Sequence, residues 1–212
     1  MAHFPIFIDL NGKRVVVVGG GAVAARKAET LADFGAVVVV IAPEFSLVMT
    51  ALARRRNIAL ILRPYAGERD IHGAALAAAA TDDCMLNERV FKDAQVAGIP
   101  VNVADDPSLC TFIFPAVVRR GELVAGLTSS GQCPALTARL RIWLEAAWPH
   151  SLAETLRELA MQRRQLIAQM TDARQRALQM EAMVDTALGK GAGHAIPGAS
   201  LYVTSTERTA SS

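Results

Sequence analysis

The chain has 212 residues, a length that accommodates one ordinary domain with an appendage or two small domains. Hydrophobic residues make up 52% of it and charged residues 20%, which excludes global disorder and permits a sizeable core. The formal net charge of +2 is too small to indicate a nucleic-acid partner.

The sequence shows neither membrane segments nor metal-binding spacing. The apolar runs at residues 15–18 and 74–80 are too short to cross a bilayer, and no signal peptide is evident. We therefore expect a soluble, cytoplasmic protein without a membrane partner. The cysteines Cys84, Cys110 and Cys133 lack CxxC spacing, which favours reduced thiols over disulfides or zinc. The four histidines have no ligand spacing either, so no fixed metal site is predicted.

The first elements form a βαβ unit. A β-branched run at residues 15–18 predicts a strand buried on both faces of a parallel sheet. Three glycines follow it, and residues 22–34 then have the apolar spacing of a helix that Gly35 ends. Residues 37–41 supply the next buried strand, which completes the unit.

Helices and strands keep alternating as far as residue 103. We expect helices at 46–56 and 87–97, and strands at 58–62, 74–80 and 99–103. The alanine-rich run 74–80 is ambiguous by itself, but its place in the series favours a strand. This order predicts an α/β fold with a Rossmann-like, doubly wound parallel sheet.

The pattern changes after Pro107. Residues 111–118 and 122–127 resemble two strands joined by a turn, and residues 134–147 resemble a helix that Pro149 ends. Residues 151–188 are helical in pattern, and the Gly-, Ser- and Thr-rich remainder predicts a poorly ordered tail. We therefore expect a Rossmann-like domain at 1–112, a small α+β segment at 113–150, a helical region at 151–188 and a tail at 189–212.

Gly19-x-Gly21-x-x-Ala24 follows the first strand and opens the first helix, as in a dinucleotide-binding turn. Gly19 permits the tight turn, Gly21 lets a pyrophosphate approach the backbone, and the small Ala24 allows close helix–strand packing. The N–H groups at the start of the helix would then bind the phosphates. A purely structural glycine turn is the alternative.

One part of the dinucleotide fingerprint is missing. The acid that usually holds the ribose hydroxyls is absent at the end of the second strand, which reads Ile41-Ala42-Pro43-Glu44. Glu44 lies slightly further along the chain than this acid usually does, so either its side chain or backbone groups would bind the ribose. No basic residue stands at this strand end to bind a 2′-phosphate, and NAD is therefore favoured over NADP.

Acids follow two later strands of the predicted sheet. Thr81-Asp82-Asp83 comes at a carboxyl strand end, where ligands bind in such sheets, but these residue types are also good helix caps. Asp105 and Asp106 follow the fifth strand, where an acid could act as a general base. Adjacent acids before a proline are more often simply turn formers.

A serine loop, Thr128-Ser129-Ser130-Gly131, leads into the helix at 134–147. Its N–H and hydroxyl groups could bind carboxylates or phosphates, or could serve only as an ordinary capped helix start. Four arginines in this region would suit a polyanionic substrate, although solvated surface arginines are the common case: Arg119, Arg120, Arg139 and Arg141.

The order of these motifs closely resembles the precorrin-2 dehydrogenase/sirohydrochlorin ferrochelatase family, the N-terminal module of siroheme synthase that also occurs as a standalone protein. The matching stretches are residues 4–10, 17–28, 79–83, 101–107, 112–116 and 134–136. They cover residues 4–150 without a large gap. Several motifs in order are far more specific than one glycine turn.

The resemblance implies NAD-dependent oxidation of precorrin-2 to sirohydrochlorin, with insertion of ferrous iron, as substrate, in many members. It implies a homodimer built by residues 113–150 with the helical part, and a tetrapyrrole but no nucleic acid as partner. The family's shared catalytic aspartate falls on Asp105. We expect the cofactor site to comprise Gly19, Gly21, Ala22, Val23, Pro43, Glu44 and Thr81, and the substrate contacts to comprise Ser129, Arg120 and Arg141.

Two alternatives remain open at the level of sequence. The chain could be a dehydrogenase that leaves iron insertion to a separate chelatase, or a non-catalytic module that senses NAD or a tetrapyrrole. The sequence departs from the family pattern at Ser130, Cys133 and Ala138. These departures bear on how the substrate is contacted and on whether the chelatase step is retained. In some family members the serine at the position of Ser129 is phosphorylated.

Overall fold

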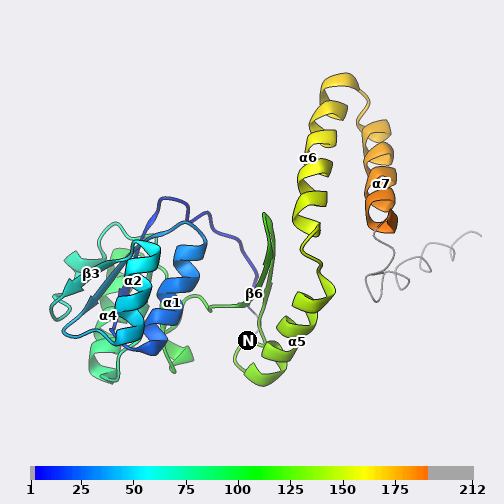
Figure 1. The fold of residues 1–212 in the computed structure, drawn as a ribbon. Coiled ribbons are helices and arrows are strands. Elements are labelled where there is room, and N and C mark those ends of the chain that lie inside the picture. Colours follow the sequence, from blue (N-terminus) through cyan, green and yellow to red (C-terminus); the bar gives the residue numbers. More distant parts are fainter. Residues whose placement is uncertain (1–2, 191–212) are drawn as a thin grey trace, which may run out of the picture. The chain divides into compact units, whose positions relative to one another are not determined.

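The computed structural model describes residues 3–190, and the chain divides into two compact units at Phe114 and Pro115 (Figure 1). We describe each unit by itself. Most of the tail expected at 189–212 lies outside the described residues. Its first two residues belong to the last helix, which the sequence pattern ended at 188.

The first unit is built on a five-stranded parallel sheet in the order β3-β2-β1-β4-β5. Its strands are β1 (Arg14–Val18), β2 (Val37–Ala42), β3 (Ala59–Leu62), β4 (Leu76–Ala79) and β5 (Val101–Val103). The predicted Rossmann-like parallel sheet is confirmed. The run at 74–80 is the strand β4, as its place in the series indicated.

Helices cover both faces of this sheet, and residues 15–18 of the central strand are therefore all buried. Val15 and Val17 pack in one cluster with α1 (Ala22–Asp33) and α2 (Leu47–Arg56). Val16 and Val18 pack in a second cluster with α3 (Glu68–Ile71) and α4 (Cys84–Ala97). The alternation of β1 side chains between the two clusters follows from the two-residue period of a strand.

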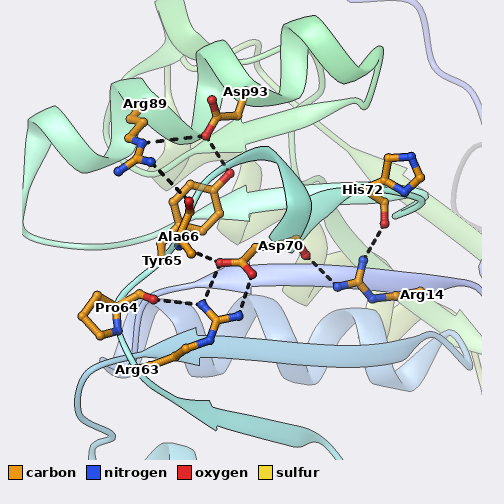
Figure 2. Close-up of polar contacts among 9 residues, drawn as sticks. All are labelled: Arg14, Arg63, Pro64, Tyr65, Ala66, Asp70, His72, Arg89 and Asp93. Carbon is orange, nitrogen blue, oxygen red and sulfur yellow. Dashed lines mark hydrogen bonds and ion pairs between the residues drawn. The ribbon is translucent and has the colours of Figure 1, made fainter.

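The short helix α3 was not predicted, and a set of polar contacts fixes it (Figure 2). The buried Asp70 carboxylate accepts two hydrogen bonds from Arg63, at 2.6 and 2.8 Å, and one from the backbone N–H of Ala66. Arg14 on β1 donates to the Asp70 and His72 carbonyls. These contacts join residues that no local pattern connects, so the helix could not be predicted from the sequence.

Two predicted boundaries were wrong by three residues or more. Helix α4 begins at Cys84 rather than 87, because the Asp83 carboxylate caps it by accepting from the N–H groups of Met85 and Leu86. The strand expected at 111–118 begins only at Ala116. Residues 111–115 form no strand because Thr111 binds back to Val101 through its backbone and hydroxyl groups.

As far as residue 190, the second unit consists of a hairpin and three helices. The antiparallel strands are β6 (Ala116–Arg120) and β7 (Leu123–Leu127), joined through Gly121 at φ +60°. The helices are α5 (Pro134–Ala147), α6 (Leu152–Gln169) and α7 (Ala173–Lys190). The helical region expected at 151–188 is thus interrupted, since Asp172 accepts from the N–H groups of Arg174 and Gln175 and starts α7.

The second unit buries little of its own surface. Among its described residues only Val118, Arg120 and Leu166 are buried, and α5 contains no buried residue. No helix within residues 3–190 combines the length and the apolar character needed to cross a membrane.

Candidate functional site

The turn between β1 and α1 requires glycine at two positions for reasons internal to the fold. A Cβ on Gly19 would lie 2.2 Å from the Ala80 carbonyl oxygen, and one on Gly20 would lie 1.9 Å from the Glu44 carbonyl oxygen. Gly19 also has φ +129°, which L side chains rarely adopt. The turn is therefore pressed between the chain segments that follow β4 and β2.

Gly21 differs from its two neighbours. It has φ −81°, and no atom of residues 3–190 lies within 4 Å of a Cβ placed on it, so packing within this part of the chain does not demand glycine here. It is the N-cap of α1 and has no side chain to satisfy the first N–H groups of that helix. The exposed Ala22 and Val23 follow it. An anion is the natural partner of such a helix start.

The end of β2 lies beside this turn. The backbone N–H of Ser46 donates to the Gly20 carbonyl at 3.0 Å, and the exposed Pro43 and Glu44 precede it. Ala42 stands where the fingerprint acid was expected; it is buried, and its Cβ would lie 3.2 Å from a Cβ on Gly20. The exposed Glu44 is therefore the acid present at this strand end.

Thr81 follows β4 and touches the same turn, because its Cγ2 would lie 3.4 Å from a Cβ on Gly19. Its hydroxyl makes hydrogen bonds with the buried Asn87 and with the backbone of Asp83. The capping interpretation of the Thr81-Asp82-Asp83 segment is therefore confirmed for Asp83. A cofactor contact of Thr81 stays a prediction, and it would use the methyl side of this residue.

The two adjacent acids after β5 differ in their surroundings. Asp106 accepts hydrogen bonds from the Ser108 N–H and hydroxyl and so caps the 3₁₀ turn η1 (Pro107–Leu109). Asp105 is exposed at φ +61°, and its carboxylate accepts no hydrogen bond from the part of the chain that the structure describes. Asp106 thus uses its carboxylate as a cap, whereas Asp105 contributes only its backbone to the turn, and its carboxylate stays available for chemistry.

The loop that carries Asp105 is held from beneath by Cys110. The half-buried thiol accepts from the Val103 N–H and lies within 3.2 Å of the Val103 and Asp106 carbonyls. Burial raises the pKa of this thiol, so it is neutral at ordinary pH. These contacts fix the loop and maintain the left-handed backbone of Asp105, a conformation that aspartate tolerates better than most residues.

Lys27 belongs to the same region and was missed by sequence reasoning. Its Nζ donates to Asn102 Oδ1 at 2.6 Å and lies 4.4 Å from the centroid of the Phe114 ring. Burial lowers the pKa of Lys27, while Cys110 and Asp105 oppose that shift. Two signals were present: a lysine on the apolar face of the first helix and an asparagine inside a buried strand.

The predicted substrate residues lie in the second unit. Arg120 is buried and donates to the carbonyls of Arg119, Glu145 and Trp148, which gives it a structural role at the end of α5. Arg141 pairs with Glu145 on the surface of α5. The substrate contacts of both arginines stay predictions.

Ser129 lies in the loop before α5. The half-buried hydroxyl accepts from the Cys133 N–H at 3.0 Å, and Ser130 has φ +53°. The N-cap Cys133 makes no side-chain bond to the helix. The loop is thus partly organised by Ser129, and its contact with substrate stays a prediction.

The sheet order brings the cofactor candidates together. The ends of β2, β1, β4 and β5 follow one another along the carboxyl edge, and α1 and α4 leave it on opposite faces. The gap between β1 and β4 is therefore the switch point at which such sheets bind ligands. This edge carries the candidates of the first unit: Gly19, Gly21, Ala22, Val23, Pro43, Glu44, Thr81 and Asp105.

This fold and this turn define a Rossmann-like nucleotide-binding protein, and the family model described as "Putative NAD(P)-binding" matches residues 6–116. The chain belongs to that family. It is 42% identical over 180 residues to the siroheme synthase of Azotobacter vinelandii, covering 83% of this chain and 38% of that protein. A siroheme synthase of Pseudomonas putida is 46% identical over 154 residues, covering 73% and 33%.

The chain spans about a third of the length of these curated relatives. The solved structure described as "SirC, precorrin-2 dehydrogenase" has the same fold, with a TM-score of 0.74 at 24% identity over 87% of this chain and 90% of that one. The resemblance that the motifs indicated is thereby confirmed.

Proposed function

We propose that this chain oxidises precorrin-2 to sirohydrochlorin with NAD⁺ as the acceptor and then inserts ferrous iron to give siroheme. The observation that carries the proposal is the placement of Asp105, exposed and without a hydrogen bond in the described chain, at the sheet edge that also holds the glycine turn. The similarity to siroheme synthases supports the choice of a tetrapyrrole over other substrates.

The residues of the turn would hold the cofactor through its pyrophosphate. The N–H groups of Gly21, Ala22 and Val23 lie at the helix start, where the N-cap Gly21 provides no side-chain hydrogen bond. The Gly19 and Gly20 positions hold that helix start close to the two neighbouring strand ends.

Glu44 favours NAD over NADP. Its exposed carboxylate follows β2, where the adenosine ribose lies in this type of fold, and would repel a 2′-phosphate. Arg63 also follows a neighbouring strand, and its backbone N–H bonds to the Ala42 carbonyl. However, its guanidinium is paired with Asp70 and is not free to bind a phosphate.

NAD⁺ supplies the hydride acceptor, so the balanced reaction converts precorrin-2 and NAD⁺ into sirohydrochlorin, NADH and one proton. The protein has to accept the proton that the macrocycle loses as its conjugation extends. Asp105 is suited to this because its carboxylate is solvent-accessible and not committed to a protein donor. Iron insertion releases two pyrrole N–H protons for each Fe²⁺ bound, and the same carboxylate would accept them.

A second copy of the chain would complete the assembly. On α5 the exposed Leu136, Leu140 and Trp143 follow the i, i+4, i+7 spacing of a single helix face. The resemblance to the family assigns this region to a homodimer. Such an assembly has no need of a membrane or a nucleic acid, and we place it in the cytoplasm.

The deciding experiment incubates the purified chain with precorrin-2 and NAD⁺ and follows NADH absorbance and the visible spectrum of the macrocycle. Ferrous or cobaltous ion is added afterwards. NADH formation followed by a metal-dependent spectral change is the expected result. Binding of NAD⁺ without NADH formation would instead favour the sensing module. Sirohydrochlorin that accumulates without a response to metal would leave only the dehydrogenase.

A further inference from the structure

Asn102 is a buried amide in the middle of β5. Its strand neighbours Val101 and Val103 pack in the second cluster, so the Asn102 side chain points to the opposite face of the sheet, toward α1. An apolar side chain is usual at such a position, since buried parallel strands are rich in valine, isoleucine and leucine. The contacts of the amide explain the exception.

Asn102 lies between a group that can only donate and a group that can only accept. Lys27 Nζ donates to Asn102 Oδ1 at 2.6 Å, and Asn102 Nδ2 donates to the Phe112 carbonyl at 3.0 Å. The same Nδ2 lies 3.4 Å from Cys110 Sγ. An ammonium has no acceptor and a carbonyl has no donor, so the side chain between them has to supply both. Asparagine does so, whereas leucine offers neither group and an ionised aspartate lacks the donor.

The Asn102 amide belongs to a set of contacts that close the loop carrying Asp105. Thr111 accepts from a backbone N–H of β5 through its hydroxyl and donates its own N–H to a β5 carbonyl, both at 2.8 Å. Cys110 Sγ accepts from the Val103 N–H at 3.2 Å. The chain therefore leaves β5 and returns beside it, and Asn102 joins the two stretches from the centre. The backbone position of Asp105 depends on how firmly these two ends are held.

Lys27 joins this loop to helix α1. The lysine neighbours the buried Ala24 and Ala28, which pack α1 against the sheet, and α1 begins directly after Gly21. Its Nζ also lies 4.4 Å from the centroid of the Phe114 ring. Burial lowers the pKa of Lys27 and so disfavours the ammonium, a penalty that a methionine in the same space would not have. The polar contact is therefore better explained by what it connects than by packing.

We propose that Lys27 and Asn102 are positioning residues that hold the Asp105 loop at a fixed place relative to α1. This inference rests on the proposed function, in which the start of α1 binds the cofactor phosphates and Asp105 accepts the proton. The hydrogen bond between the two residues then helps to fix the distance from the bound cofactor to the proton acceptor. A displacement of about 1 Å in such a geometry lowers the rate roughly 100-fold.

The first test measures amide hydrogen exchange by NMR in the full chain, without substrate. Lys27→Met removes the donor and keeps a side chain of similar length. The Val103 and Thr111 amides, which close the loop, exchange at least about fivefold faster in this variant. The Ala80 amide, which donates to the backbone of β1, keeps its wild-type rate. Wild-type exchange at Val103 and Thr111 overturns the inference.

Lys92→Met is the matched control for this measurement. Lys92 is exposed on α4 and pairs there with Glu88, so the variant loses the same kind of charge without touching the Asn102 amide. Exchange at Val103 and Thr111 stays at the wild-type rate. Faster exchange in this control as well would mean that the loss of any lysine loosens the loop, which overturns the inference.

The second test separates kcat from cofactor binding. In Lys27→Met the kcat for precorrin-2 oxidation falls about tenfold to 100-fold, because the proton acceptor is no longer held in place. The Kd for NAD⁺ stays within about twofold of the wild-type value, since the contacts that hold the glycine turn are unchanged. Lys92→Met keeps both values. A wild-type kcat in Lys27→Met, or an equal loss in cofactor binding, overturns the inference.

A double-mutant cycle tests whether the two residues act as one unit. Lys27→Met combined with Asn102→Ala lowers kcat no further than Asn102→Ala alone, because Lys27 acts through the amide. Losses that multiply show two independent actions and overturn the inference. Where Asn102→Ala fails to fold, judged by its thermal unfolding curve, the exchange rates and the kcat of Lys27→Met decide.

The outcomes separate this inference from the proposed function. If the wild type forms NADH from precorrin-2 and Lys27→Met forms it at the same rate, the inference is overturned and the proposed function stands. If the wild type forms no NADH, the proposed function fails, and the catalytic effect of the two residues fails with it. The exchange rates still show whether Lys27 and Asn102 hold the loop.

Discussion

Within the glycine turn, some residues are needed for folding and another is suited to ligand binding. A Cβ on Gly19 or Gly20 would meet a backbone carbonyl at a distance that no Cβ tolerates, whereas a Cβ on Gly21 would meet no atom of the described residues within 4 Å. The three consecutive glycines therefore have different functions, which a pattern of glycine spacing does not distinguish. The first two allow the turn to form, and the third is the one that a ligand would need.

This difference predicts opposite behaviour of two alanine variants. Gly21→Ala keeps the wild-type fold, at a cost of about 0.5 kcal/mol for the changed N-cap, and raises the Kd for NAD⁺ at least about tenfold. Gly20→Ala destabilises the protein by about 2 kcal/mol, since the segment at Glu44 has to move away. Urea unfolding and calorimetric titration with NAD⁺ measure the two effects. Gly21→Ala binding NAD⁺ as tightly as the wild type would contradict the assignment.

The adjacent acids give a second test at this scale. Asp105→Asn should lower kcat for precorrin-2 oxidation by at least about 100-fold, because it removes the proton acceptor. Its thermal unfolding should match the wild type, since the Asp105 side chain is exposed, makes no hydrogen bond within the described chain and keeps a left-handed conformation that asparagine tolerates. Asp106→Asn is the matched control, because asparagine still caps η1. Equal losses in both variants would argue against Asp105 as the base.

Among the elements, α3 shows how one buried carboxylate organises a connection. Asp70 joins Arg63, the Ala66 N–H and, through its carbonyl, Arg14, so the segment between β3 and β4 is tied to β1 (Figure 2). The Arg63 hydrogen bonds hold the pKa of Asp70 below its ordinary value. A lowered pKa means that folding favours the ionised form.

This predicts an acid-dependent contribution to stability. The contribution of Asp70 is present above the unfolded pKa of about 4 and is lost as the pH falls through the lower folded value. Asp70→Asn should therefore reduce the free energy of unfolding by about 2 kcal/mol at pH 7 and by less at pH 3. Urea unfolding at the two pH values measures this. A loss that is equal at both would show that Asp70 acts through its shape rather than its charge.

At the scale of the whole molecule, the second unit has too little core to explain its own stability. Three of its described residues are buried, whereas α5 exposes an apolar face at Leu136, Leu140 and Trp143. Small units with so little buried surface usually obtain the rest from another chain. The sheet-based first unit, with two buried clusters, has no such deficit.

We therefore expect that charge on the α5 face dissociates the protein. Trp143→Glu and Leu140→Glu should convert a dimer into a monomer in analytical ultracentrifugation and lower the melting temperature. Val96→Glu, at a still more exposed apolar residue of α4, is the control that should remain a dimer. A wild type that sediments as a monomer at micromolar concentration would remove the dimer from the proposal.

The element order of the first unit was readable from the sequence, because buried parallel strands leave continuous β-branched or alanine runs and glycines mark their ends. The predicted boundaries were wrong where a side-chain contact sets the end of an element. Examples are the Asp83 cap at the start of α4 and the Thr111 contact that precedes β6. Helix α3 was missed because Arg63 and Arg14 fix it from separate strands.

By itself the sequence determined the Rossmann-like architecture, the glycine turn and the presence of an acid after the fifth strand, since strand periodicity and turn chemistry are local. Only the tertiary structure distinguished Asp105 from Asp106 and Gly21 from Gly20, because both distinctions depend on neighbours from other segments. It also brought Lys27, Asn102 and Phe114 together from positions far apart in the chain. A buried charge can be recognised only once the groups around it are known.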